Sequence, residues 1–269
     1  MKRGTGVFGK QYEYGYKNET HAPGSVVRAL FDEMIKLDNE SVDYLYGGYT
    51  DLSFRYIAGS RPVLEKNAKE LQGGSNVQTV DNILAFCRNV VERCNTPSKD
   101  FIYGGIEEDV IERATYWCTD VARVACVLFQ IAGFPSRIIV TVNSNFAYCG
   151  HIVTEVCYDG KWCLTDPNAS IAFRHENGTP ASAWEVHNDY DIANNIYRIT
   201  DPDGFYGNSI FFPPGEQFES VAIVNYYVDD YDKYDYTTSG TNDFYKKILQ
   251  HSREKWAGGL RWVHGEERL

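Results

Sequence analysis

Apolar residues recur at helical spacing in three stretches of the first half of the chain. Residues 24–38 and residues 79–94 carry apolar side chains every three or four positions, which predicts an amphipathic helix in each. The Leu-Gln-Gly-Gly-Ser-Asn run at 71–76 predicts a loop between them. Cys87 and Cys94 fall on the apolar stripe of the second helix, so we interpret both as small buried side chains.

The third stretch begins near Cys118, and Gly133 and Pro135 follow it at the positions where a helix usually ends. Its predicted apolar face consists of Val121, Val124, Ala125, Leu128, Ile131 and Ala132. A cysteine in the first turn of a helix feels the positive end of the helix dipole, which favours its thiolate form. Asp120 opposes the thiolate, so we expect a nearby cation. Cys126 lies in the middle of the helix and is predicted to be a core residue.

The periodicity then changes to the alternation that is typical of β-strands. Residues 137–143 predict one strand, and residues 150–167 predict a hairpin with two polar-ended arms. The segment 143–150 between them is expected to be a loop at the mouth of a cleft.

The Asp159-Gly160 pair is a strong signal for a two-residue turn of type I′. If the residues on either side of this turn pair with each other, His151 and Asp166 become diagonal neighbours on one face of the hairpin. Such neighbours lie within reach of a hydrogen bond between imidazole and carboxylate. A register slip of one residue would send them to opposite faces.

A cysteine that opens a helix, followed by a strand histidine and a carboxylate, has the order of a thiol triad. The stretch 118–168 also resembles the transglutaminase-like branch of the papain-like thiol enzymes. The motifs that carry this resemblance are Cys118, the Gly-Phe-Pro-Ser-Arg run 133–137, His151, Glu155-Val156, the turn Asp159-Gly160 with Trp162, and Asp166-Pro167.

The resemblance implies that Cys118 is the nucleophile, His151 the base and Asp166 the acid that orients the base. It also implies an oxyanion hole built from the backbone N–H of Cys118 and an upstream side-chain donor. Tyr103 and Trp117 are the candidates for that donor, and a packed core aromatic is the alternative interpretation of each.

Three positions depart from the family pattern. Tyr116 stands where a small residue is usual, Val153 where an aromatic residue is common, and Asn168 where threonine is usual. These departures remove no catalytic group, but they leave the substrate specificity open.

The expected fold is α+β, a papain-like or transglutaminase-like core in which the nucleophile helix packs on an antiparallel sheet. Residues 1–100 are expected to form a mainly helical N-terminal elaboration, 101–200 the catalytic core, and 201–269 a C-terminal extension of the same domain. Within that extension, the acidic segment 228–236 predicts a solvated loop and 244–262 predicts a helix.

Composition narrows the classes of partner. The net charge of -11 argues against nucleic acid or an anionic membrane as the main partner, and no apolar stretch is long enough to span a membrane. The first twenty residues lack an apolar run and the 7 cysteines include no C-x-x-C pair. We therefore expect free thiols and a cytoplasmic location, with an exported mature chain as the alternative.

The chemistry implied is acyl transfer from an amide or peptide bond through a thioester, with a peptide, a protein or an amide-containing small molecule as substrate. Hydrolysis is favoured because water needs no dedicated site. The alternatives are a protein transamidase and a non-catalytic domain that binds peptides or glycans. The sequence does not indicate an oligomeric state.

A zinc site made of Cys149, His151, Cys157 and Cys163 is a further alternative, but it lacks the tight cysteine knuckles of structural zinc. We expect no cofactor and no metal.

Overall fold

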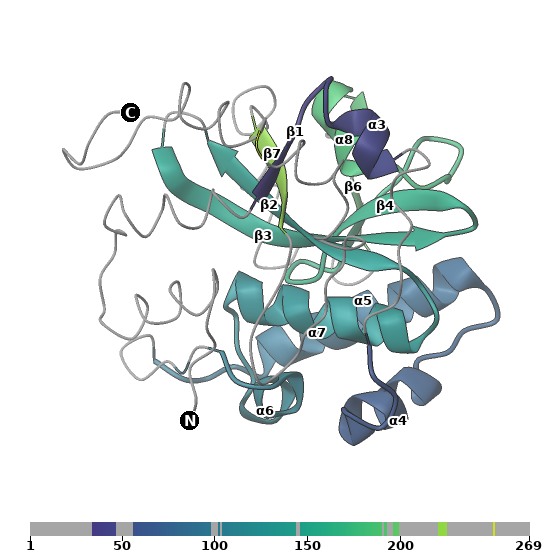
Figure 1. Ribbon diagram of the computed structural model, residues 1–269. Helices are drawn as coiled ribbons and strands as arrows, with labels where there is room; N and C mark the ends of the chain where they lie inside the picture. The colour runs from purple at the N-terminus through teal and green to yellow at the C-terminus, as the bar shows by residue number, and fades with distance from the viewer. Residues whose placement is uncertain are drawn as a thin grey trace.

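The computed structural model describes residues 34–46, 56–97, 102, 104–143, 146–189, 191–192, 196–198, 220–224 and 250. Within these residues a seven-stranded antiparallel sheet separates two groups of helices (Figure 1). The α+β class predicted from the sequence is confirmed. No helix in the described ranges has both the length and the apolarity to cross a membrane.

The strands are β1 (Met34–Leu37), β2 (Ser136–Asn143), β3 (Phe146–Tyr158), β4 (Lys161–Asp166), β5 (Ile171–Phe173), β6 (Ile196–Arg198) and β7 (Ser220–Val224). Their order across the sheet is β1-β7-β2-β3-β4-β5-β6. The helices are α3 (Val42–Tyr46), α4 (Pro62–Glu70), α5 (Asn76–Glu92), α6 (Glu107–Arg113), α7 (Cys118–Ile131) and α8 (Ala183–Asn188). Helices α4 to α7 lie on one side of the sheet, and α3 and α8 lie on the other (Figure 1).

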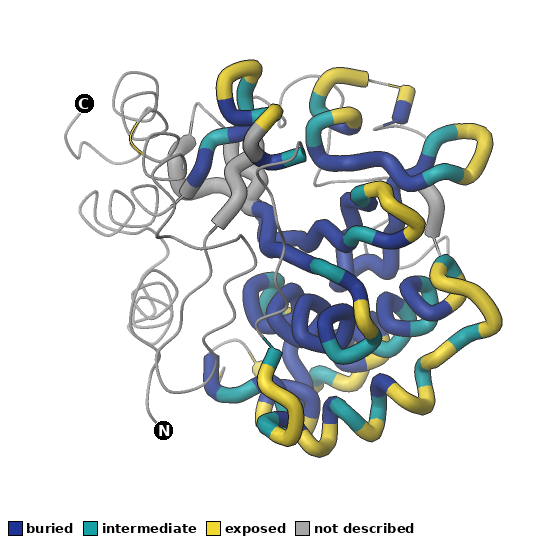
Figure 2. Tube along the Cα trace, turned by 45° about the vertical axis from the view of Figure 1, so that its right-hand side comes forward, coloured by how far each residue is buried: buried dark blue, intermediate teal, exposed yellow. Residues whose placement is uncertain are grey.

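Helix α7 occupies the centre of the helical layer. It packs on α4, α5 and α6 and on strands β2 and β3. All its residues from Thr119 to Gln130 are buried, so the helix has no solvated face, and Figure 2 shows the buried tube running through the middle of the molecule. The sequence predicted an amphipathic helix. The polar side of α7 is buried as well, because the charged Asp120 and Arg123 find ionic partners on the neighbouring helix α6.

Helix α5 begins and ends close to its predicted limits. Ser75 caps it, with its hydroxyl accepting a hydrogen bond from the N–H of Gln78 at 3.2 Å. Cys87 is fully buried in the core between α5 and α7, as predicted. Cys94 lies beyond the end of the helix and is half-buried, so it is not the core residue that the apolar stripe suggested.

The hairpin has the predicted register. Asp159 and Gly160 both have positive φ, 52° and 74°, as a type I′ turn requires. Tyr158 pairs with Lys161, and the same register continues to Thr154 opposite Thr165.

Two predictions of local structure were wrong. Met34–Leu37, expected at the end of a helix, is strand β1 because it pairs with β7, and Ile35 and Leu37 are buried on the sheet. Residues 146–150, expected in a loop, extend β3, because Phe146 and Gly150 pair with Asn143 and Val142 at the end of β2 across an irregularity at Val142/Asn143. Each segment is a strand because it pairs with a partner strand, and the local sequence does not reveal that partner.

The predicted acidic loop at 228–236 lies outside the described residues, as does nearly all of the helix predicted for 244–262.

Candidate active site

Cys118 is the first residue of α7, where the sequence placed it. Trp117 precedes it in an extended conformation as the N-cap residue, and its carbonyl accepts the first helical hydrogen bond, from the N–H of Val121 at 3.1 Å. The thiol is half-buried and lies close enough to the imidazole ring of His151 to affect the pKa of that ring. The nucleophile predicted from the sequence therefore contacts the predicted base.

His151 and Asp166 form the pair that the hairpin register predicted. The Nε2 atom of His151 lies 2.9 Å from Oδ2 of Asp166, and the two residues are 4% and 1% exposed. The other carboxylate oxygen, Oδ1, accepts hydrogen bonds from the backbone N–H groups of Asn168 at 2.9 Å and Ala169 at 3.4 Å. With Nε2 bound to Asp166, Nδ1 is the ring nitrogen available to Cys118.

The ionisation of His151 follows from these neighbours. Burial alone would lower its pKa, but the charge and hydrogen bond of Asp166, together with the contact to Cys118, raise the pKa of His151 to about 10. The imidazole therefore keeps its proton at neutral pH. It is the cation that was expected beside the start of α7.

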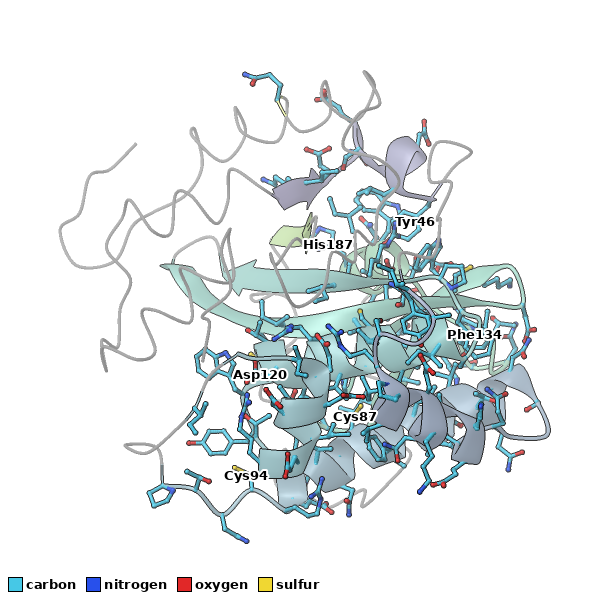
Figure 3. The ribbon with its side chains drawn as sticks, turned by 60° about the horizontal axis from the view of Figure 1, so that its bottom comes forward. Tyr46, Cys87, Cys94, Asp120, Phe134 and His187 are labelled. Atoms are coloured by element: carbon cyan, nitrogen blue, oxygen red, sulfur yellow. The ribbon has the colours of Figure 1, made fainter. Side chains whose placement is uncertain are left out.

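Asp120 was expected to oppose the thiolate, but the charge of its carboxylate is balanced by arginine side chains. Its carboxylate is fully buried, and it accepts hydrogen bonds from Arg113 at 2.9 Å and from the N–H of Gly104 at 3.2 Å. Arg123, one turn further along α7, lies 3.8 Å away. Figure 3 shows Asp120 in the helical layer below the sheet.

A second buried carboxylate fixes the neighbouring helices to α7. Glu107 of α6 bonds Arg61, the N-cap residue of α4, and Arg123 of α7, each at 2.7 Å. These ion pairs join α4, α6 and α7, and so they hold the helix that presents Cys118.

The oxyanion donors stay a prediction. Trp117 is half-buried and packs against the helical core, and its side chain does not cap the first turn of α7. The backbone N–H groups of that turn are thus not occupied by the capping side chain. Tyr103 lies outside the described residues.

Arg137 and Glu155 belong to the sequence motifs but lie away from the thiol chemistry. They face each other in the β2–β3 register and bond at 2.7 Å with no exposure of either side chain. The guanidinium lies between the rings of Tyr46 and Trp162, at 4.6 Å and 3.8 Å from the ring centres. Figure 3 shows Tyr46 on the side of the sheet opposite to α7, where α3 and α8 pack.

The sequence did not identify Asn168 or Arg88 as parts of this region. Asn168 contacts both the Asp166 turn and the segment before Cys118, and Arg88 of α5 binds the backbone of Asn168. The available signals were that position 168 departs from the family pattern and that the predicted hairpin register places it opposite His151.

The cysteines of the alternative zinc site are spread along the hairpin. Cys157 pairs with Trp162 next to the turn, and Cys163 is buried opposite Val156, where burial raises its pKa to about 12. Asp166 occupies one ring nitrogen of His151. The described residues hold no group of three or more possible metal ligands.

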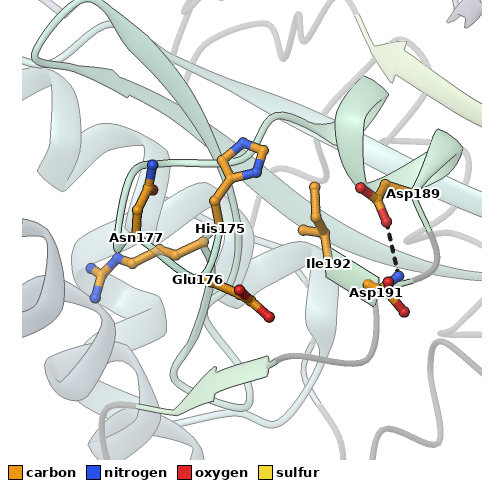
Figure 4. A pocket seen from close by; sticks show the side chains of 7 residues that line it. His175, Glu176, Asn177, Asp189, Asp191 and Ile192 are labelled. Atoms are coloured by element: carbon orange, nitrogen blue, oxygen red, sulfur yellow. Dashed lines mark hydrogen bonds between the residues drawn. The ribbon is translucent and has the colours of Figure 1, made fainter.

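A polar pocket of about 890 Å³ lies between the end of β5 and the segment after α8 (Figure 4). Its lining residues are Arg174, His175, Glu176, Asn177, Asp189, Asp191 and Ile192. Arg174 is paired with Asp81 at 2.5 Å and His175 with Glu185 at 3.3 Å. The lining includes none of the predicted catalytic residues.

A helix that begins at a cysteine and packs on an antiparallel sheet carrying a histidine–aspartate pair is the arrangement of the papain-like thiol enzymes. Residues 67–167 match the family model of the transglutaminase-like superfamily, so this segment of the chain is similar to that superfamily. Cys118, His151 and Asp166 all fall inside the matched segment. No curated protein and no solved structure gives a significant match.

Proposed function

We propose that this protein is a cysteine-dependent enzyme that cleaves an amide or peptide bond through a thioester acyl-enzyme. Cys118 is the nucleophile, His151 the general acid and base, and Asp166 the acid that orients His151. The observation that carries the proposal is the 2.9 Å contact between His151 and Asp166, made by a ring that also interacts with the Cys118 thiol at the start of α7.

In the first half-reaction the Cys118 thiolate attacks the carbonyl carbon of the substrate and a C–S bond forms. Negative charge collects on the carbonyl oxygen, and the N–H of Cys118, with Trp117 or Tyr103, is the proposed donor set for it. The C–N bond then breaks, and the imidazolium of His151 gives its proton to the departing amine. Asp166 stabilises the imidazolium before transfer and fixes the ring afterwards.

In the second half-reaction neutral His151 takes a proton from water as the water oxygen attacks the thioester. The C–S bond breaks, the carboxylic acid leaves, and the thiolate–imidazolium pair is restored. We favour water as the acceptor because it needs no binding site, whereas an amine must be bound and oriented. Transamidation is the alternative, and the net charge of -11 supports it by attracting cationic amines.

Alkylation rates test whether the site is active. An ordinary thiol with a pKa of about 8.5 is less than about 1% ionised near pH 6, so only a cysteine paired with an imidazolium reacts quickly there. Cys94 and Cys157 are also half-buried and serve as internal controls. We expect iodoacetamide to modify Cys118 at least about 10²-fold faster than either control. Equal rates would favour a non-catalytic binding domain.

The acceptor is tested separately with a peptide library and a labelled primary amine. Products are compared between the wild-type protein and Cys118→Ala, which lacks the nucleophile. Unlabelled acid products that depend on Cys118 support hydrolysis, and amine label in the products identifies a transamidase. The same comparison tests the proposed substrate class of peptides, proteins and amide-containing small molecules.

We place this activity in the cytoplasm. The six cysteines that the structure describes are all free thiols, which suits a reducing compartment. Cell fractionation with an antibody against the protein tests this location.

A further inference from the structure

Asn168 joins the turn after Asp166 to the residue two positions before Cys118. Its backbone N–H donates to Oδ1 of Asp166 at 2.9 Å, and its side-chain amide donates to the backbone oxygen of Tyr116 at 2.9 Å. One residue thus contacts the carboxylate that holds His151 and the segment that leads into the nucleophile helix.

A third contact fixes Asn168 from the helical layer. Arg88 of α5 donates from Nη1 to the backbone oxygen of Asn168 at 3.1 Å, and its Nε binds Glu92 at 2.9 Å. Asn168 is 1% exposed and Arg88 is 7% exposed, so water does not compete for these bonds. Helix α5, the start of α7 and the Asp166 turn therefore meet at one residue, which contacts the first and the last through its backbone and the second through its side chain.

The amide of Asn168 carries a cost that a different residue would avoid. Its oxygen, Oδ1, is buried and has no hydrogen-bond partner within the described part of the chain. An unpaired buried acceptor costs about 1–3 kcal/mol. The Tyr116 carbonyl can only accept, so the amide cannot turn over to satisfy this oxygen. Because the unpaired oxygen makes the Asn168 amide unfavourable for stability, we explain this residue by the position of its N–H donor against the Tyr116 carbonyl.

We propose that Asn168 is a positioning residue of the thiol site, an inference that rests on the proposed function. By holding the Tyr116 carbonyl, it sets the distance between the start of α7 and the Asp166 turn. That distance in turn sets how close the Cys118 thiol lies to the imidazole of His151. A displacement of about 1 Å in a site of this kind lowers reactivity about 10²-fold.

The variants separate the side-chain contact from the backbone contact. Asn168→Ala removes the donor to Tyr116 and keeps the backbone N–H that binds Asp166. Asn168→Asp keeps the shape of the side chain and also lacks the donor. Asn82→Ala is the matched control, because the Asn82 amide likewise donates to a backbone oxygen, that of Leu71 at 3.0 Å, and is half-buried.

The measurement is the rate at which iodoacetamide alkylates Cys118 between pH 5 and pH 9, followed by mass spectrometry on the full chain. This profile reports the thiolate–imidazolium pair, which a merely structural role of Asn168 would not change in a folded protein. For both Asn168 variants we expect a rate near pH 6 about ten-fold or more below the wild type, with the midpoint at higher pH. Asn82→Ala is expected to keep the wild-type profile.

The outcomes distinguish the two proposals. If wild-type Cys118 reacts quickly near pH 6 and a folded Asn168 variant keeps its profile, the positioning role is wrong and the proposed function stands. If wild-type Cys118 reacts no faster than Cys94, the proposed function is wrong and the positioning role falls with it. A loss of equal size in Asn82→Ala would attribute the effect to general destabilisation and also overturn the positioning role.

Discussion

The guanidinium of Arg137 bonds the carboxylate of Glu155 at 2.7 Å, with both side chains fully buried on the face of the sheet opposite to α7. Glu155 also accepts from the Tyr46 hydroxyl at 2.7 Å and from the N–H of Ala183 at 2.6 Å, and Nη1 of Arg137 donates to the backbone oxygen of Leu45 at 2.8 Å. The pair therefore ties helices α3 and α8 to strands β2 and β3.

Loss of this buried pair should be costly. Glu155→Gln leaves the Arg137 charge buried without its counter-charge, and we expect a loss of about 3–5 kcal/mol in the free energy of unfolding. Glu70→Gln is the matched control, because it breaks the exposed Lys66–Glu70 pair, which spans 3.9 Å. Urea titrations measure both, and similar midpoints for the two variants would contradict a structural role for the buried pair.

Asp166→Asn should weaken the proposed nucleophile without unfolding the turn. The amide oxygen still accepts from Asn168, but the charge that raises the pKa of His151 is gone, so this pKa should fall from about 10 toward its ordinary value. We expect Cys118 alkylation near pH 6 to slow by about 10²-fold, the difference between an ion pair and an ordinary thiol. Asp159→Asn, in the turn of the same hairpin, should react like the wild type.

Stability should depend on pH through His151. Its pKa in the folded protein, about 10, lies above the ordinary value of 6.5, so the protonated ring contributes stability that is complete below about pH 6.5. This contribution is lost as the pH rises toward 10. Between pH 6.5 and pH 10 the wild type should lose more stability than His151→Gln, by an amount on the order of 3 kcal/mol. Parallel stability curves would show that His151 is not the titrating group.

Any side chain at Gly160 should lower the stability of the protein, although there is room for a Cβ atom. Its φ is 74°, and an added Cβ would meet no atom within 4 Å, so the cost comes from the backbone alone. We expect Gly160→Ala to destabilise the protein by about 1 kcal/mol and to leave Cys118 reactivity unchanged. Gly74→Ala is the control at a glycine without positive φ. Thermal melts should give a lower Tm for Gly160→Ala than for Gly74→Ala.

The parts of the fold that sequence predicted are those with local signals. The start of α7 at Cys118 follows from its apolar stripe and the glycine after it, and the Asp159-Gly160 turn alone fixes the register that unites His151 with Asp166. A two-residue turn permits only one register of the two strands. The contact between His151 and Asp166, which are 15 positions apart, could therefore be predicted from the sequence.

The parts that sequence missed depend on distant partners. Strand β1 exists because β7, near residue 220, provides its hydrogen bonds, and the helical spacing of residues 24–38 gave no sign of this. Asn168 shows the same limit inside the site. Its proposed positioning role depends on a hydrogen bond to Tyr116, 52 positions earlier, and no periodicity links the two residues.

Cys118 comes from the helical layer, whereas His151 and Asp166 come from the sheet. Whenever these layers are apart, as in a chain emerging during synthesis or in a partly melted molecule, Cys118 has no imidazole beside it. The proposed chemistry therefore depends on docking of the two layers, and it should appear only in a completely folded copy.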